Sequence, residues 1–316
     1  MSIQSYIREI GRGRDGAKAL TREQAADLMG MILDDKVSEL QLGAFCLAMR
    51  IKGETEQEMA GFLDAAQARL NYFTAPPANN PAIVIPSYNG ARRLPVLTPL
   101  LGILLAREGF AVLMHGSTTE LTRVPSQDVL KELGFAKAVS TCELKPGELV
   151  FADTNLISPQ LQRLLDVRRT IGLRNSAHSM VKLLQPVKHL TLTLNLTQDH
   201  QPKAFLITSY THPEYATSMR KTLELMRGNA VLMRGCEGEA VADARRAPAY
   251  AVIRNGELAF ERESEKGSVA PTELFSGELS AKSIAAYTSK MLSGLIPIPK
   301  PILDQIAIIK LASSKF

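Results

Sequence analysis

The sequence predicts an α/β protein in which a small N-terminal helical bundle precedes a larger domain with a mainly parallel central sheet. Apolar residues recur at helical spacing through residues 1–70. A segment rich in proline and asparagine follows at 74–81. Beyond it, short apolar runs alternate with helical stretches, and this alternation is typical of βαβ units and a buried parallel sheet.

The composition is that of a globular protein with more than one domain. Its 316 residues are 45% hydrophobic and 22% charged, which are ordinary values. The three cysteines, Cys46, Cys142 and Cys236, lie far apart without CxxC spacing, so we expect neither a disulfide framework nor a zinc ribbon. The N-terminus is polar, and no apolar run approaches the ~20 residues of a membrane span. We therefore expect a cytoplasmic protein that does not enter a membrane.

Three capping boxes mark the starts of the N-terminal helices. Each pairs a serine or threonine with a glutamine or glutamate three residues later: Thr21 with Gln24, Ser38 with Gln41, and Thr55 with Glu58. Apolar residues follow each box at helical spacing. Helices this short need a partner surface to bury their apolar stripes, which favours a dimer contact.

The second domain is predicted to alternate strands and helices. We expect strands at 82–85, 111–114, 149–151, 190–196, 204–208 and 230–233. We expect helices at 96–107, 126–133, 212–227, 280–292 and 301–312. Over residues 250–261, the Asn255-Gly256 pair predicts a hairpin with a two-residue turn.

A further helical stretch, 158–184, is predicted inside the second domain. It begins with Ser158 as a cap and Pro159 in the first turn, and it is interrupted near 172–176. We expect a helical domain over residues 1–73, with helices from about 158–185 packing on it. The α/β domain then comprises residues 80–157 and 186–316.

Positive charge is concentrated in one part of the chain. The net charge is +5, from 37 basic and 32 acidic residues. The window 159–190 alone holds six basic residues and one acid, Asp166; the basic residues are Arg163, Arg168, Arg169, Arg174, Lys182 and Lys188. Clustered charge of one sign focuses a field on a partner of the opposite sign. The window therefore indicates an anionic partner, with a solvated helix face as the alternative.

Three junctions between a strand and a helix are candidate anion sites, because loop amides and helix N-termini meet ligands there. The first, 86–93, offers Arg92 and Arg93 to phosphate and Tyr88 to a base, although it is no GxGxxG or Walker loop. An exposed turn is the alternative.

The second junction, 115–119, places His115, Gly116 and hydroxyl groups ahead of Arg123. A structural histidine is the alternative there. The third, 168–178, gathers arginines where one helix ends and another begins, with Asn175 or Ser176 as the cap. It is the strongest anion-site signal in the chain. Tyr210 is a second candidate for stacking on a base.

Motifs for common catalytic chemistry are missing from the sequence. We find no clustered histidine, cysteine and carboxylate set for a metal, and no GxSxG elbow for a serine hydrolase. No carboxylates stand together in the candidate loops to form an acid–base pair. The sequence therefore predicts no catalytic residue, no metal site and no cofactor.

Several strings give the chain a family resemblance over essentially its whole length. They are IKGE at 51–54, IVIPSYNGAR at 83–92, LTPL at 97–100, RNSAH at 174–178, HPEY at 212–215 and EGE at 237–239. With the short helical N-terminus and a second strand ending in His-Gly, this layout resembles the anthranilate phosphoribosyltransferase family. The strings are most similar to its divergent YbiB-type nucleic-acid-binding branch. The resemblance implies a nucleoside phosphorylase or phosphoribosyltransferase type of fold.

The sequence departs from the enzymes of that family at their working parts. The glycine-rich diphosphate loop, GTGGDG, falls at 87–93, where bulky side chains would obstruct a diphosphate. The Lys-His-Gly-Asn motif becomes Met-His-Gly-Ser at 114–117, and the Asp-Glu pair for magnesium falls near 237–239. Arg174 takes the position of the substrate-side arginine. The resemblance leaves a remnant phosphate site at Asn89, Gly90, Thr98, His115, Gly116 and Ser117.

The resemblance implies a homodimer, paired through the N-terminal helices, with a basic groove that holds nucleic acid. We expect binding of DNA or RNA, single- or double-stranded and without sequence preference, because no recognition helix or zinc finger is found. The groove residues that we predict are Arg92, Arg93, Arg123, Arg163, Arg168, Arg169, Arg174, Lys182 and Tyr88.

Two other functions compete with this one. The first is a glycosyl- or phosphoribosyltransferase that uses phosphoribosyl diphosphate and magnesium, with Thr98, His115 and Arg174 around the phosphorylated sugar. The second is a scaffold that dimerises and binds neither ligand.

Overall fold

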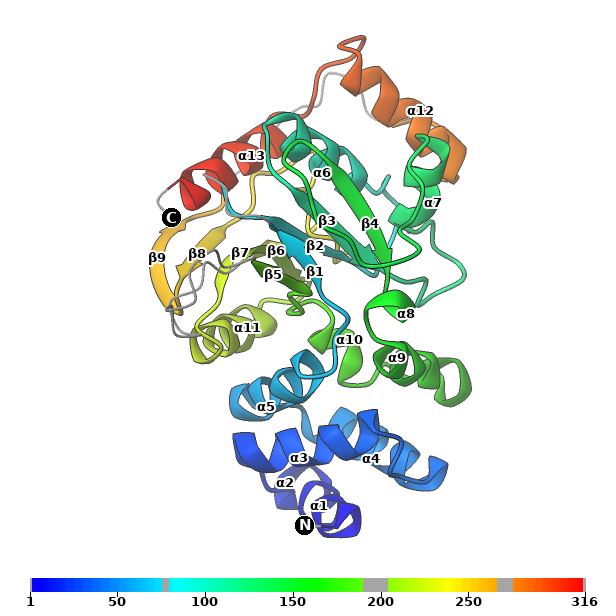
Figure 1. Ribbon diagram of the computed structural model, residues 1–316, viewed down its shortest axis with the longest axis vertical. Coiled ribbons are helices and arrows are strands. Elements are labelled where there is room, and N and C mark those ends of the chain that lie inside the picture. The colour runs from blue at the N-terminus through cyan, green and yellow to red at the C-terminus, as the bar shows by residue number, and fades with distance from the viewer. Residues whose placement is uncertain (1, 76–79, 190–203, 266–274, 315–316) are drawn as a thin grey trace.

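The computed structural model describes residues 2–75, 80–189, 204–265 and 275–314, arranged as a helical part and an α/β part (Figure 1). The helical part carries the chain's N-terminus, and the α/β part is built around a seven-stranded sheet. The predicted fold class, a helical bundle with a mainly parallel α/β domain, is confirmed.

Five helices form the first section of the helical part: α1 (Ile3–Ile10), α2 (Gly13–Gly16), α3 (Arg22–Leu33), α4 (Glu39–Lys52) and α5 (Glu56–Gln67). All three predicted capping boxes are formed, with both reciprocal hydrogen bonds present at the starts of α3, α4 and α5. Helices α3 and α5 pack closely. Gly61 allows this approach, because a Cβ there would lie 2.1 Å from the Arg22 carbonyl oxygen.

Three later helices join the helical part: α8 (Thr154–Ile157), α9 (Pro159–Ile171) and α10 (Ala177–Met180). Helix α9 contacts α3, and α10 contacts α5. The Ser158 side chain caps α9 by accepting from the Leu161 amide, and Gly172 ends the helix with a left-handed backbone. Helices α9 and α10 are therefore packed on the N-terminal helices.

A two-stranded parallel sheet lies where the chain crosses between the two parts. It pairs β1 (Phe73–Ala75) with β5 (Val187–His189), and neither strand was expected from the sequence. Strands of three residues are too short to show a periodic pattern, so only their pairing identifies them.

The large sheet has the strand order β4-β3-β2-β6-β7-β8-β9. Its parallel strands are β2 (Ile83–Ser87), β3 (Val112–Gly116), β4 (Leu149–Asp153), β6 (Phe205–Tyr210) and β7 (Asn229–Arg234). The predicted hairpin is the antiparallel pair β8 (Tyr250–Arg254) and β9 (Glu257–Arg262). Its two turn residues, Asn255 and Gly256, both have positive φ, as a type I′ turn requires. The strand predicted at 190–196 lies outside the described residues.

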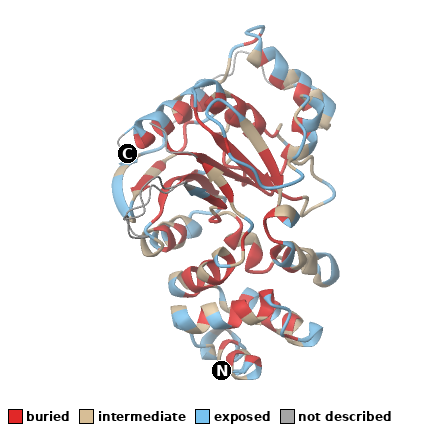
Figure 2. Ribbon diagram, in the orientation of Figure 1, coloured by how far each residue is buried: buried red, intermediate tan, exposed pale blue. Residues whose placement is uncertain are grey.

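Helices cover both faces of the sheet. Helices α6 (Thr98–Arg107) and α13 (Lys300–Ser313) pack over one face, and α11 (Glu214–Leu225) over the other, while α7 (Ser126–Glu132) packs on α12 (Ala281–Leu292). The strands at the centre of the sheet are largely buried (Figure 2). Their side chains alternate between the two layers: Ile83 and Ile85 join the apolar cluster that includes α6 and α13, and Val84 joins the cluster on the α11 side.

The order of the strands places the ligand-binding edge of the sheet. From β2 the chain moves outward to β3 and β4 on one side, whereas β6 and β7 lie on the other side. In open parallel sheets, ligands bind at such a reversal, outside the carboxyl ends of the strands. In the described part of the chain, no helix has both the length and the apolarity needed to cross a membrane.

Candidate anion-binding cleft

A cleft of about 550 Å³ opens at this edge of the sheet, between the helical part and the α/β part. It is lined by the turn between α4 and α5, the loop after β2, the segment 174–183, the start of α11 and the turn after β7. We call it the basic cleft, because its described lining includes five cationic side chains and two carboxylates. These are Arg50, Arg92, Arg123, Arg174 and Lys182, with Glu54 and Glu237.

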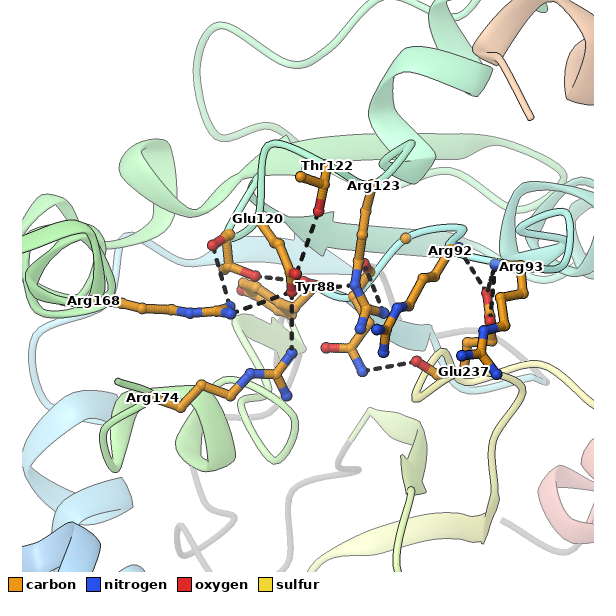
Figure 3. Close-up of polar contacts among 12 residues, drawn as sticks. Tyr88, Arg92, Arg93, Glu120, Thr122, Arg123, Arg168, Arg174 and Glu237 are labelled. Carbon is orange, nitrogen blue, oxygen red and sulfur yellow. Dashed lines mark hydrogen bonds and ion pairs between the residues drawn. The ribbon is translucent and has the colours of Figure 1, made fainter. Parts of the chain in front are cut away.

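Three arginines converge on one carboxylate beside the cleft. Arg123 and Arg168 each lie 3.2 Å from the carboxylate of Glu120, and Arg174 lies 4.0 Å from it (Figure 3). Burial alone would raise the pKa of Glu120, but the arginines lower it below its ordinary value. Burial also lowers the pKa of Arg174, and Arg168 and Arg123 add to this effect. This arginine cluster (Arg123, Arg168 and Arg174) therefore keeps a net positive charge that an external anion would stabilise.

Lys182 and His178 lie deeper in the same cleft. The Lys182 ammonium donates to the Gly238 carbonyl oxygen at 3.1 Å, and burial lowers its pKa to about 8. Burial, together with Arg174 and Arg168, lowers the pKa of His178 to about 3. Lys182 is thus mostly charged at pH 7, whereas His178 is neutral there.

The loop after β2 donates its first amides to a buried glutamate. Glu239, which is 1% exposed, accepts from the backbone N–H groups of Asn89 and Gly90, each at 2.7 Å. Its other oxygen accepts from the hydroxyl groups of Ser87 and Thr98. Three members of the predicted remnant phosphate site, Asn89, Gly90 and Thr98, are therefore brought together, but around a carboxylate of the chain itself.

Glu237 occupies the second half of the loop. Its carboxylate accepts from the backbone N–H groups of Arg92 at 2.7 Å, Arg93 at 3.0 Å and Leu94 at 3.3 Å (Figure 3). We call residues 237–239 the acidic turn. Magnesium with a diphosphate does not fit this arrangement, because both carboxylates are engaged by the loop. Among the described residues, no group of three histidine, cysteine or carboxylate side chains could hold a metal ion.

The remaining members of the remnant phosphate site do not form an open anion site. His115 is fully buried and lies 2.8 Å from the Tyr88 hydroxyl through Nδ1, and burial lowers its pKa to about 4. Gly116 permits close strand contact, because a Cβ there would lie 1.9 Å from the Ser87 carbonyl oxygen. Ser117 is also buried.

The structure corrects the expectation that Tyr88 stacks on a base. Its side chain is buried, with the residue only 6% exposed, and its hydroxyl also accepts from Thr154. The contacts with His115 on β3 and Thr154 at the start of α8 hold Tyr88 in the core. Tyr210 and Tyr215 line the basic cleft instead, and Tyr215 is 41% exposed.

The basic residues of the window 159–190 do not share one surface. Arg168, Arg174 and Lys182 reach the basic cleft or its rim, whereas Arg163 pairs with Asp35 and Glu39 on the helical part. This placement corrects the inclusion of Arg163 in the groove.

Two other predicted arginines lie at the margin. Arg169 pairs with Asp166 at 3.3 Å, and its side chain is largely exposed. Arg93 is exposed and lies outside the cleft lining, although Arg92 is part of it.

Sequence reasoning missed three contributors to the cleft. Arg50 lies in the last turn of α4, outside the basic window 159–190, and the neighbouring IKGE string at 51–54 was the available signal. Glu120 and Glu237 are acidic residues near clusters of basic residues. Counting charges along the sequence does not show which arginines or amides they contact. The EGE string marked the acidic turn, but nothing in it revealed the loop as its partner.

Comparison with known proteins places the chain in a family. Residues 4–69 match the glycosyl transferase family, helical bundle domain. The protein YbiB of Escherichia coli (strain K12) is 36% identical over 314 residues, covering 97% of this chain and 93% of that protein. The anthranilate phosphoribosyltransferase of Dictyoglomus thermophilum is 26% identical over 58% of this chain and 54% of its own length.

Solved structures show the same fold. Anthranilate phosphoribosyltransferase from Thermus thermophilus matches with a TM-score of 0.70 and 20% identity, over 98% of this chain and 87% of that one. The Saccharomyces cerevisiae enzyme in complex with PRPP and Mg matches with a TM-score of 0.66 and 16% identity, over 98% and 88%. The chain therefore belongs to the same family as YbiB and is built on the anthranilate phosphoribosyltransferase scaffold.

Proposed function

We propose that this protein binds nucleic acid without sequence preference and holds its phosphates in the basic cleft. One observation carries the proposal: the three guanidinium groups of the arginine cluster share a single carboxylate, Glu120. Guanidinium groups match the geometry of phosphate, and their excess charge attracts an anion. Arg50, Arg92 and Lys182 add further cations along the same cleft.

The shape and lining of the cleft favour a single strand. Tyr210, His212 and Tyr215 line the wall at the start of α11, where unstacked bases could rest on their rings. A cleft of about 550 Å³ can enclose part of a single strand more readily than a duplex. Contacts to phosphates and ring faces carry no sequence information, so we expect no sequence preference.

We propose further that the protein acts as a homodimer through its N-terminal helices. Leu40, Leu47 and Ile51 on α4 are 84%, 48% and 53% exposed, and their spacing puts them on one face of the helix. Covering this apolar stripe with a second copy would bring together two basic clefts in one particle. Light scattering should report a dimer for the wild type and a monomer for Leu40→Glu/Leu47→Glu; a wild-type monomer would contradict the proposal.

The test of nucleic-acid binding is fluorescence anisotropy with a labelled oligothymidylate at several salt concentrations. We expect Arg123→Ala/Arg174→Ala to lower the affinity at least tenfold and to reduce the salt slope by about 1.4, since each single-strand phosphate contact contributes about 0.7. Arg163→Ala is the matched control, because it removes an arginine that pairs within the helical part. Wild-type binding that the double variant leaves unchanged would overturn the proposal, as would no binding at low salt.

Phosphoribosyl transfer is the second candidate, and the matches to anthranilate phosphoribosyltransferases favour it. The contacts of the acidic turn oppose it, because they engage the loop that would receive the diphosphate. Thermal unfolding with phosphoribosyl diphosphate and magnesium separates the two functions. A magnesium-dependent rise in melting temperature would support transfer, and no rise at millimolar ligand would count against it.

A further inference from the structure

The acidic turn satisfies an unusual set of donors in the loop after β2. Five backbone N–H groups, those of Asn89, Gly90, Arg92, Arg93 and Leu94, donate to the two carboxylates. Successive backbone N–H groups directed at one point form a concave anion-binding site. The hydroxyl groups of Ser87 and Thr98 complete the half that faces Glu239.

We propose that the acidic turn is a tethered substitute for an anionic ligand, which fills the loop and keeps free diphosphates and phosphates out. A carboxylate accepts hydrogen bonds from these donors as a phosphate group would. Because the turn belongs to the same chain, its effective concentration at the loop is far above that of a free anion. The loop is thus an anion site that the protein occupies with its own side chains.

The backbone of the acidic turn is shaped for this contact. Glu237 has a φ of 53°, a left-handed conformation that is uncommon for a residue other than glycine. Gly238 has a φ of 88°, and a Cβ there would lie 1.7 Å from the side-chain amide nitrogen of Asn89. Lys182 and Ser209 both donate to the Gly238 carbonyl oxygen, so the turn is also held from the cleft side.

The two halves of the loop differ in access. Glu239 is buried in the core, whereas Glu237 is half-buried and lines the basic cleft with Asn89 and Arg92. Removing the Glu237 carboxylate would therefore leave the three N–H groups that it accepts from without that partner, next to the Arg92 guanidinium at the cleft. The inference predicts that this change creates a site for a phosphate-type anion, and it does not depend on nucleic-acid binding.

The test compares two variants at one position by calorimetric titration with inorganic pyrophosphate. Glu237→Gly removes the carboxylate and accepts the left-handed backbone, so the fold should survive. Glu237→Gln removes the same charge but keeps an oxygen over the amides. We expect pyrophosphate to bind Glu237→Gly at least tenfold more tightly than the wild type, and Glu237→Gln to gain much less. Glu257→Ala, on the exposed strand β9, is the control for loss of a distant charge.

Backbone amide NMR locates the gain. In Glu237→Gly, pyrophosphate should shift the amide signals of Arg92, Arg93 and Leu94, and the same titration of the wild type should leave them in place. Equal affinities in the wild type and both variants would overturn the inference. So would an equal gain in Glu237→Gln and Glu237→Gly, which would assign the effect to charge alone. Loss of oligothymidylate binding in Arg123→Ala/Arg174→Ala has no bearing on these outcomes.

Discussion

The loop after β2 and the arginine cluster lie at the same edge of the sheet, but they differ in whether their hydrogen-bond donors are already paired with carboxylates of the chain. In the loop, five backbone N–H groups are matched by two carboxylates of the acidic turn. In the arginine cluster, three guanidinium groups share one carboxylate, that of Glu120. The loop is therefore closed to an external anion, and the cluster is open to one.

The difference follows from the kinds of donor involved. A buried backbone N–H, such as that of Asn89 or Gly90, has a fixed position, and leaving it without an acceptor costs about 1–3 kcal/mol. The chain must therefore supply a partner at all times. An arginine at a cleft can be solvated in the free protein and turn to a phosphate on binding. Guanidinium donors on flexible side chains can remain solvated until a ligand binds. Buried backbone N–H donors need an acceptor within the protein at all times.

The largest effect is expected from removing the buried carboxylate of Glu239. Glu239→Ala leaves two N–H groups and the Thr98 hydroxyl without an acceptor, whereas the Ser87 hydroxyl keeps Ser126, and we expect the change to lower the free energy of unfolding by roughly 3–5 kcal/mol. Urea denaturation measures the change. Glu257→Ala should alter the midpoint very little. A loss below about 1 kcal/mol would mean that the loop does not need its internal anion.

Removing the carboxylate of the arginine cluster should have the reverse effect on function. Glu120→Gln keeps the size of the side chain and frees one guanidinium charge, so we expect affinity for oligothymidylate to rise about tenfold, or about 1.4 kcal/mol. Glu39→Gln, beside Arg163, is the matched control. Unchanged affinity in Glu120→Gln would show that the cluster does not contact the strand.

Lys182 should make both nucleic-acid affinity and stability depend on pH. Its pKa of about 8 lies below its ordinary value of 10.5, and a bound phosphate would raise it. Affinity should therefore fall as the pH rises from 7 to 9, by roughly fivefold, because the neutral amine is no longer attracted to phosphate. Stability should rise over about pH 8 to 10.5, since the unfolded chain then binds the extra proton.

His178 and the arginines near Lys182 do not change their charge between pH 7 and 9. The pKa of His178 is about 3, and guanidinium groups keep their charge. Anisotropy and urea denaturation across this pH range, with Lys182→Met beside the wild type, measure both trends. A slope in affinity that survives in Lys182→Met would assign the titration to another group.

The smallest effect is expected at Tyr88. Tyr88→Phe removes a buried hydroxyl that contacts His115 and Thr154, so stability should fall by about 1 kcal/mol. Affinity for oligothymidylate should stay unchanged, because the ring does not reach the cleft surface. Tyr215→Ala, at the exposed wall, should weaken binding instead. A loss of binding in Tyr88→Phe without loss of stability would show that the Tyr88 hydroxyl contacts the strand and not only His115 and Thr154.

Much of the fold could be predicted from local patterns. The capping boxes placed the starts of α3, α4 and α5, and the Asn255-Gly256 pair placed the hairpin turn. These signals work because caps and tight turns are set by a few neighbouring residues. Strands β1 and β5 were missed, because each is stabilised by a partner far away in the chain.

The sequence by itself determined the fold class, the positions of most helices and strands, the clustering of positive charge and the unusual composition of the loop after β2. Only the tertiary structure decided which charges act together. In the folded protein Arg163 lies outside the cleft, Tyr88 lies in the core, and the acidic turn contacts the loop after β2. The physical reason is range: a helix or a turn is specified by residues a few positions apart, whereas a binding site is assembled from segments that meet only when the sheet has formed.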